Sequence, residues 1–371
     1  MKVRTVRFNK QDQPEFFKEL NRRVNQYFKE NNLSKHANST MVFKTIFMLF
    51  LYLSPLVLML TNVVTGFWPV LGMWVIMGFG MSGIGTSVMH DAIHGAYSSN
   101  KNVNKLIGYV INLVGGYHVN WKIQHNVLHH SFTNIHDYDE DIDKGIMRFS
   151  PTQDHKSIFR FQVFYAPILY CVLTIYWYLI KDFEQLYKFN KKGLIADQGL
   201  NVWTALAGIL FHKAWYFILF IALPLKFINL PVGQILLGFL VMHFICGMML
   251  ALIFQTAHVI EETNFYKVDE NCSVENNWAI HQLRTTANFA RNSTVFAWFI
   301  GGLNHQIEHH LFPHICHVHY PQIANIVEKT AGEYGIPYYQ HKTFLGAIKS
   351  HFTLLNQLGT GAYDRKLAKA A

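Results

Sequence analysis

No Asp, Glu, Lys or Arg interrupts the stretch TIFMLFLYLSPLVLMLTNVVTGFWPVLGMWVIMGFGMSGIGTSVMH, residues 45–90. An α-helix rises about 1.5 Å per residue and crosses about 30 Å of membrane hydrocarbon in roughly 20 residues. The stretch is therefore long enough for two membrane crossings, about 45–64 and 68–89. The segment from Asn62 to Pro69 is the best place for the turn between them.

A second charge-free stretch runs from Phe227 to Ile260. Together with the apolar residues before it, this stretch predicts a second pair of crossings, about 208–228 and 233–256, with a turn at residues 229–233. Of the 371 residues, 51% are hydrophobic and only 15% are charged, whereas soluble domains carry about 25% charged residues. The sequence therefore predicts an all-α integral membrane protein with four transmembrane helices.

A fifth apolar stretch, Phe161 to Ile180, is also long enough to cross the membrane. It lies between the second and the third of the histidine clusters described below. A third crossing between those clusters would place them on opposite faces of the membrane, where they cannot share one site. We therefore expect this stretch to lie in the membrane interface or to pack against the helix bundle. The alternative, that it spans the membrane, stays open.

Basic residues are concentrated before the first crossing, and the turn after that crossing has none. The basic residues of this segment are Lys2, Arg4, Arg7, Lys10, Lys18, Arg22, Arg23, Lys29, Lys35 and Lys44. By the positive-inside rule, residues 1–42 form a cytosolic segment, and each pair of crossings returns the chain to the cytoplasmic face. The net charge of +9 favours contact with anionic membrane lipids or an acidic partner protein, and no pattern indicates nucleic acid.

Eight histidines fall into three short clusters, HDAIH, HNVLHH and HQIEHH. They are His90, His94, His125, His129, His130, His305, His309 and His310. Each cluster repeats an i, i+4 spacing, which stacks two imidazoles on one face of an α-helix. Neutral imidazole binds iron, zinc, copper and nickel, and eight imidazoles exceed the four ligands of one tetrahedral zinc. The clusters therefore predict a site for two metal ions at one membrane surface.

Two further histidines lie on the last predicted crossing. We expect His258, at its cytoplasmic end, to be a metal ligand; the alternative is a structural histidine at a helix end. We expect His243, in its middle, to be a structural, hydrogen-bonded histidine. The acidic residues after the second cluster either accept the second N–H of ligating histidines or form a solvated loop. They are Asp137, Asp139, Glu140, Asp141 and Asp143.

The phrases HDAIH, HNVLHHSFTN and HQIEHHLFP resemble the three histidine boxes of the membrane fatty acid desaturase family. Gln306 in the third box and the phrase WAIHQLRTTANF, residues 278–289, are similar to the branch that contains front-end and linoleoyl-type desaturases. The resemblance runs from about Phe43 to about Gly335 and implies a desaturase domain over residues 43–371. It also implies four crossings and a cytosolic helical cap that holds a histidine-rich di-iron site.

Carried over to this chain, the resemblance implies metal ligands from the three boxes and from the last crossing. These ligands would be His90, His94, His125, His129, His130, His258, His309 and His310. Either His305 or Gln306 completes the third box, because both lie within one helical turn of His309. The family pattern favours Gln306. No catalytic residue beyond the metal ligands is implied.

The resemblance implies an O₂-dependent fatty acyl desaturase with two iron ions. It would remove two adjacent hydrogens from an acyl chain, leaving a double bond and water, which is chemistry that a metal cofactor must carry. The substrate would be a fatty acyl lipid or an acyl-CoA. The sequence has no HPGG motif of a fused cytochrome b5 domain, so we expect electrons from a separate ferredoxin or cytochrome b5 type donor. The unfused form favours a bacterial plasma membrane.

Two other functions fit parts of the pattern. A membrane lipid hydroxylase would use the same di-iron site, although the QIEHH form of the third box argues against it. A metal-binding membrane protein without enzymatic activity would carry ligands deep inside its crossings, yet only His243 lies there. The desaturase is therefore the favoured hypothesis.

Overall fold

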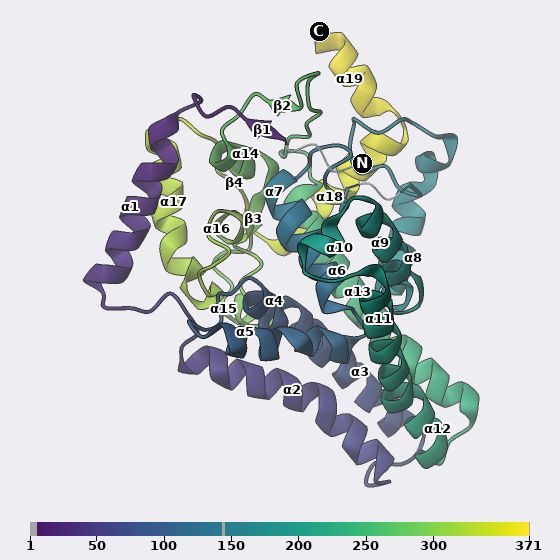
Figure 1. Ribbon diagram of the computed structural model, residues 1–371. Coiled ribbons are helices and arrows are strands. Elements are labelled where there is room, and N and C mark those ends of the chain that lie inside the picture. The colour runs from purple at the N-terminus through teal and green to yellow at the C-terminus, as the bar shows by residue number, and fades with distance from the viewer. Residues whose placement is uncertain (1–5, 143–144, 371) are drawn as a thin grey trace. The chain divides into compact units, whose positions relative to one another are not determined.

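The computed structural model describes residues 6–142 and 145–370, and it is mostly helical (Figure 1). The chain forms two compact units. The first unit contains Asn38–Ile123 and Ile168–Ala251, and the second contains Arg4–Ala37, Gln124–Pro167 and Leu252–Ala371. Each unit is described by itself.

The first unit begins with a helical hairpin. Helix α2 (Ser39–Leu60) packs along α3 (Phe67–Gly83), and a Cβ on Gly80 would lie 2.7 Å from the backbone N of Tyr52, so only glycine allows this approach. Helix α3 continues without a break through the π-helix η1 (Ile84–Val88) into α4 (Met89–Ile93).

Shorter helices and a second hairpin complete the first unit. They are α5 (Lys101–Gly108), the 3₁₀-helix η2 (Tyr109–Val114), α6 (His118–Lys122), the π-helix η5 (Trp177–Lys181), α9 (Asp182–Lys191), α10 (Leu194–Asp197), α11 (Val202–Phe217), the π-helix η6 (Ile218–Ala222) and α12 (Leu223–Phe227). Helices α8 (Gln162–Tyr176) and α13 (Val232–His258) each have residues in both units. A buried ion pair between Asp182 and Lys213 joins α9 to α11.

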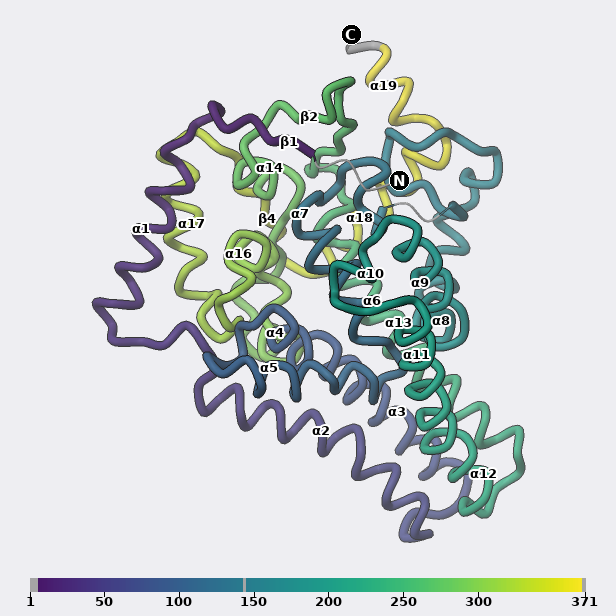
Figure 2. Tube along the Cα trace, viewed as in Figure 1, coloured from purple at the N-terminus to yellow at the C-terminus, as the bar shows by residue number. Residues whose placement is uncertain are grey.

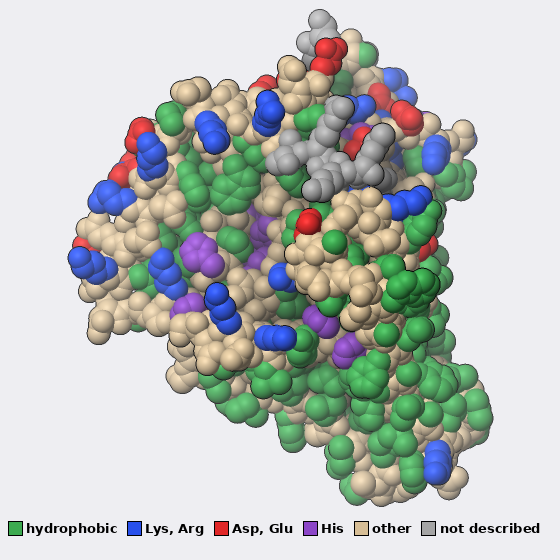
Figure 3. Space-filling view, in the orientation of Figure 1, with side chains coloured by type: hydrophobic (Ala, Val, Ile, Leu, Met, Phe, Trp, Pro, Cys, Tyr) green, Lys and Arg blue, Asp and Glu red, His purple; other side chains and the backbone are tan. Residues whose placement is uncertain are grey.

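Five helices among the described residues are long and apolar enough to cross a membrane, which agrees with an integral membrane protein. They are Ser39–Leu60, Phe67–Ile93, Ser157–Lys191, Val202–Phe227 and Val232–His258. Hydrophobic side chains cover most of the visible surface over α2, α11 and α12 (Figure 3). Because water does not favour such a surface, these faces are suited to contact lipid.

The helices differ in their limits from the crossings that the sequence predicts. Helix α2 begins at Ser39 because the side chain of Asn38 accepts a hydrogen bond from the Met41 N–H at 3.1 Å. It ends at Leu60, and the turn to α3 follows there. In the same way, Asn201 caps the helix that begins at Val202. These polar caps lie outside the hydropathy pattern, so the helices begin before the predicted crossings, whose limits stay a prediction.

Helix α8, which covers most of the fifth apolar stretch, packs against α13 inside the first unit. A Cβ on Gly247 would meet the carbonyl oxygens of Tyr170 and Cys171 at 2.6 Å, so the two backbones touch there. Thr174 and His243 are also hydrogen-bonded at 2.9 Å. The stretch thus forms a helix that packs against α13, and this packing suits a spanning helix as well as a non-spanning one, so the expectation that it does not cross the membrane stays a prediction.

The second unit is built around short helices. They are α1 (Pro14–Glu30), the π-helix η3 (Ile123–His129), α7 (His130–Phe132), the 3₁₀-helix η4 (Ser157–Phe161), α14 (Trp278–Thr285), α15 (Thr294–Phe299), α16 (Gln306–Leu311), the 3₁₀-helix η7 (His317–His319), α17 (Tyr320–Glu333), α18 (Phe344–Gly359) and α19 (Ala362–Ala370). Helices α1 and α17 lie side by side (Figure 2). Their apolar faces enclose a core that includes Leu20, Ile307 and Val327.

Two small parallel sheets tie distant segments of the second unit together. Strand β1 (Arg7–Phe8) pairs with β2 (Ser273–Val274), in the register Arg7 to Ser273. Strand β3 (Ala287–Phe289) pairs with β4 (Tyr339–His341), in the register Ala287 to Tyr339. Phe289 of the second sheet also donates its backbone N–H at 3.0 Å to the carbonyl oxygen of Asn304, the residue before the third histidine box.

Candidate metal centre

The second histidine box is wound as a π-helix, not as the α-helix that its spacing predicts. Helix η3 contains His125 and His129, and α7 begins at His130. In a π-helix the backbone repeat is i, i+5, so His125 and His130 come onto one face. Their Nε2 atoms are 3.2 Å apart. The wider turn brings all three imidazoles of this box together, and π-helical turns occur frequently at functional sites.

The third box forms the short helix α16, which begins at Gln306. His309 and His310 lie on this helix, and His305 precedes its first residue. The Nε2 atom of His309 is 2.9 Å from that of His130. The second and third boxes, although far apart in sequence, therefore bring their imidazole nitrogens into contact within the second unit.

His258, at the end of α13, lies with two box histidines. One candidate ligand atom from each of His129, His258 and His310 falls within 4.8 Å of the others, and all three residues are buried. A second such group contains His130, His309 and His310. The structure thus places six of the predicted ligands, His125 included, in one cluster of the second unit.

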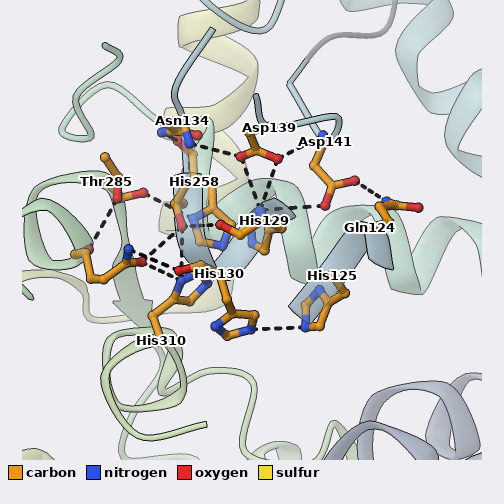
Figure 4. Close-up of polar contacts among 12 residues, drawn as sticks. Gln124, His125, His129, His130, Asn134, Asp139, Asp141, His258, Thr285 and His310 are labelled. Atoms are coloured by element: carbon orange, nitrogen blue, oxygen red, sulfur yellow. Dashed lines mark hydrogen bonds and ion pairs between the residues drawn. The ribbon is translucent and has the colours of Figure 1, made fainter. Parts of the chain in front are cut away.

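Hydrogen bonds to Nδ1 orient the imidazoles of the first group (Figure 4). His129 Nδ1 is 3.1 Å from a carboxylate oxygen of Asp139. His258 Nδ1 is 3.1 Å from the backbone oxygen of Thr285, and His310 Nδ1 is 2.8 Å from Oε1 of Gln282. A carboxylate and a carbonyl only accept hydrogen bonds. Each Nδ1 therefore carries the proton and donates it.

This assignment leaves a lone pair on Nε2 of each of the three imidazoles, because a neutral imidazole carries one N–H. Among the described residues, Nε2 of His258 has no hydrogen-bond partner. Buried acceptor atoms that lie this close together are stabilised by a cation between them. Metal-ligating histidines have this arrangement, with the other ring nitrogen donating to a carboxylate or a carbonyl. The donor set therefore fits a metal ion.

A phenol contacts Nδ1 of a fourth imidazole. The hydroxyl of Tyr320 lies 3.3 Å from Nδ1 of His309. Asp139 is itself fixed, because its two oxygens accept the backbone N–H groups of Asn134 at 2.9 Å and Asp141 at 3.0 Å. Two of the acidic residues that follow the second box thus lie behind His129, Asp139 at 3.1 Å and Asp141 at 3.6 Å from its Nδ1. Asp143 lies outside the described residues.

The first box belongs to the first unit. His90 lies on α4, and His94 caps the end of that helix. Their ring centroids are 4.9 Å apart, as the i, i+4 spacing predicts, and the Trp121 ring lies against both. The two imidazoles therefore lie one helical turn apart, and the indole ring of Trp121 packs against both.

His305 and Gln306, which precede His309 and His310 in the third box, are both buried. Neither ring nitrogen of His305 and neither amide atom of Gln306 has a hydrogen-bond partner among the described residues. Burial and, to a smaller extent, the charge of Arg291 together lower the pKa of His305 to about 3. Glu308 is anchored instead: Asn288 donates to it at 2.8 Å and Tyr338 at 2.9 Å. His305 and Gln306 therefore both remain candidate metal ligands.

Two supporting residues carry no signal in the sequence pattern. Gln282 lies in the WAIHQLRTTANF phrase, but nothing in that phrase predicts contact with His310. Tyr320 follows the third box by ten residues, and only the fold brings it to His309. In contrast, His243 has both ring nitrogens engaged, with Tyr216 at 3.1 Å and Thr174 at 2.9 Å. It is the hydrogen-bonded structural histidine that the sequence predicts.

The chain is similar to known fatty acid desaturases. The chain is 37% identical over 348 residues to a sn-1 linoleoyl-lipid 6-desaturase of Synechocystis sp., covering 93% of this chain and 95% of the relative. It is 35% identical to a sn-1 linoleoyl-lipid 6-desaturase of Arthrospira platensis, covering 92% of each chain. It is 33% identical to an acyl-lipid (8-3)-desaturase of Physcomitrium patens, covering 96% of this chain and 74% of the relative. The sequence profile of the fatty acid desaturase family matches residues 66–342, a span that contains all three histidine boxes, and the chain belongs to that family of oxidoreductases.

Proposed function

We propose that the chain is an O₂-dependent front-end desaturase that inserts a double bond at carbon 6 of a linoleoyl group carried by a membrane lipid. The position and the substrate come from the relatives of Synechocystis sp. and Arthrospira platensis, whose names specify a linoleoyl lipid and a 6-desaturase. The relative at 33% identity is named an (8-3)-desaturase, so a double bond at a position other than carbon 6 is a possible outcome of the test.

We propose two iron ions as the cofactor. The proposed ligands are His90, His94, His125, His129, His130, His258, His309 and His310, with His305 or Gln306 in addition. One observation carries this proposal: candidate ligand atoms of His129, His258 and His310 converge within 4.8 Å, while Nδ1 of each imidazole contacts an acceptor that fixes its orientation. Bound iron would supply the oxidation of an unactivated methylene group, which amino acid side chains cannot perform.

The protein's own residues would hold the imidazoles rigidly and exclude water from a long acyl chain. Each buried CH₂ group of the substrate contributes about 0.8 kcal/mol. An apolar channel would therefore both bind the chain and fix which carbon atoms lie near the metals. The 30 Phe and 18 Tyr residues supply many side chains for such a surface.

We propose four crossings, with both termini and the histidine centre on the cytoplasmic side of a bacterial plasma membrane. The basic segment before α2 supports a cytosolic N-terminus. Parity supports four crossings, since the second and third boxes must lie on one side if they share a centre. The helix Ser157–Lys191 would then pack on α13 without crossing to the far side. Residues 1–42 would be the cytosolic segment, and residues 43–371 the desaturase domain.

We propose a separate ferredoxin or cytochrome b5 type protein as the electron donor. The basic cytoplasmic surface would attract such an acidic partner. Long-range attraction of this kind weakens as salt screens the charges. Reduction by the donor should accordingly slow as ionic strength rises.

Fatty-acid profiling tests the proposed activity. A bacterial host without polyunsaturated lipids is supplied with linoleic acid and expresses the chain, and its lipids are analysed by gas chromatography with mass spectrometry. We expect a new C18 acid with double bonds at carbons 6, 9 and 12, absent from cells that express His309→Ala at the same level. A hydroxylated acid would show a hydroxylase, and an unchanged profile would contradict the proposed substrate.

A further inference from the structure

The three histidines of one candidate metal group come from three separate segments of the second unit. His129 ends η3, His258 ends α13 and His310 lies on α16. Their candidate ligand atoms nevertheless lie within 4.8 Å of one another. Two consecutive residues, Thr133 and Asn134, touch the supports of all three. Both residues are completely buried.

Asn134 links the segment of His129 to the segment of His258. Its backbone N–H donates at 2.9 Å to Asp139, the carboxylate that accepts the proton of His129 Nδ1. Its side-chain amide donates to the backbone oxygens of His258 at 2.9 Å and Asn264 at 3.1 Å. The backbone of Asn134 is left-handed, with φ 56°, a conformation that asparagine tolerates well.

Thr133 links the segment of His129 to the support of His310. Its hydroxyl oxygen lies 2.7 Å from the backbone oxygen of His129 and 3.0 Å from Oε1 of Gln282, and its single proton is shared between these acceptors. The same Oε1 accepts the proton of His310 Nδ1 at 2.8 Å. Gln282 also donates to the backbone oxygen of His130 at 3.3 Å, which fixes the orientation of its amide.

We propose that Thr133 and Asn134 are positioning residues that hold His129, His258 and His310 together as one metal subsite. Neither residue of this clamp, meaning Thr133 with Asn134, is itself proposed as a metal ligand, and the Thr133 hydroxyl also lies 3.3 Å from Nδ1 of His310. The clamp acts by fixing two backbone segments and two of the groups that accept Nδ1 protons. The inference rests on the proposed metal centre and goes beyond it, because it assigns a role to two residues outside the ligand set.

Asn134→Gly tests one half of the clamp. Glycine keeps the left-handed backbone and removes the two amide donors. Asn62→Gly is the matched control, because Asn62 has the same φ of 56° and donates to one backbone oxygen, that of Phe227, in an exposed turn. The full-length protein is stripped of metal, checked for a single size-exclusion peak, and titrated with Fe²⁺ under anaerobic conditions.

We expect wild type to bind two Fe²⁺ ions, and we expect Asn62→Gly to bind them with the same affinities as wild type. Loss of groups behind metal ligands typically weakens metal binding about 10- to 100-fold. Asn134→Gly should weaken the affinity for one of the two ions by that factor and leave the affinity for the other unchanged. Equal binding of both ions by Asn134→Gly and wild type would overturn the role of Asn134.

Thr133→Val tests the other half with little change in shape, and Thr133→Ser restores the hydroxyl. Thr256→Val is the control, since Thr256 is also completely buried and bonds to the backbone oxygen four residues before it, Leu252. We expect Thr133→Val to weaken the affinity for one Fe²⁺ ion and Thr133→Ser to restore that affinity. If Asn134→Gly does not give a single size-exclusion peak, the Thr133 and Thr256 variants alone test the clamp. A Thr133→Val protein that binds Fe²⁺ like wild type would then overturn it.

The titration separates this inference from the proposed function. Wild-type protein that binds two ions, with unchanged binding in both variants, would contradict the clamp alone. Wild-type protein that binds no Fe²⁺ would contradict the metal centre, and the clamp with it.

Discussion

Two histidines on the same helix, His243 and His258 of α13, show how one residue type serves two purposes. Both are buried. His243 has a partner at each ring nitrogen, Tyr216 on Nε2 and Thr174 on Nδ1. His258 has a partner at Nδ1 only, the backbone oxygen of Thr285, and its Nε2 has none among the described residues.

The difference teaches that burial alone does not identify a metal ligand. A buried imidazole with both nitrogens engaged is satisfied and stabilises the packing of its neighbours. A buried imidazole with a fixed Nδ1 proton and an open Nε2 is prepared to bind a cation. The state of the second nitrogen therefore distinguishes His243 from His258.

The largest effect that this comparison predicts is at His258. His258→Ala should lower desaturation at least 100-fold, because it removes one of the three Nε2 lone pairs of a metal subsite. Product is measured by gas chromatography of lipids from cells with matched expression. His243→Asn in the same assay should keep most of its activity per folded molecule. Full activity of His258→Ala would remove His258 from the ligand set.

A smaller effect is expected behind the ligand His129. Asp139→Asn should weaken the affinity for one Fe²⁺ ion about 10- to 100-fold, because the amide replaces one of two oxygens that both accept N–H groups. Anaerobic Fe²⁺ titration measures the change. Asp137→Asn is the control, as Asp137 is exposed in the same loop. A wild-type affinity in Asp139→Asn would show that the carboxylate charge is not needed.

A structural histidine outside the membrane helices should make stability depend on pH. His351 on α18 is buried and contacts the backbone oxygen of Val259, and burial lowers its pKa to about 4. In the unfolded chain the pKa is about 6.5. The unfolded state thus binds more protons between these values, and the free energy of unfolding falls as pH drops from about 6.5 to 4.

The expected slope is up to about 1.4 kcal/mol per pH unit for this one group. Thermal unfolding in detergent from pH 7.5 to 5 measures it. His351→Asn, which keeps a donor for the Val259 oxygen, should show a shallower dependence. An identical dependence in the variant would mean that His351 does not titrate on unfolding.

The smallest effect is expected at His243. His243→Phe leaves the hydroxyls of Tyr216 and Thr174 without their imidazole partner, at a cost of about 0.5–2 kcal/mol inside a membrane bundle. The midpoint of thermal unfolding should fall by a few degrees, with Fe²⁺ binding unchanged. Loss of Fe²⁺ binding in this variant would erase the distinction between the two histidines.

The sequence predicts the apolar helices well because hydropathy over 20 residues is a local property. It also predicts that His243 and His258 differ, from their depths along one apolar stretch. The π-helix at the second box could not be predicted, because HNVLHH has a regular α-helical spacing and its wider turn depends on tertiary contacts. Gln282 and Tyr320 could not be predicted either, since only folding brings these distant residues behind His310 and His309.

The central claim is that the histidine boxes and His258 hold two iron ions. Metal analysis of the purified full-length protein after anaerobic reconstitution with Fe²⁺ tests this claim most directly. We predict about two irons per chain for wild type, as expected when the ligand count exceeds the needs of one metal, and a reduced content for His258→Ala with wild-type content for His243→Asn. A single tightly bound zinc and no iron, or equal iron in His258→Ala and wild type, would contradict the account.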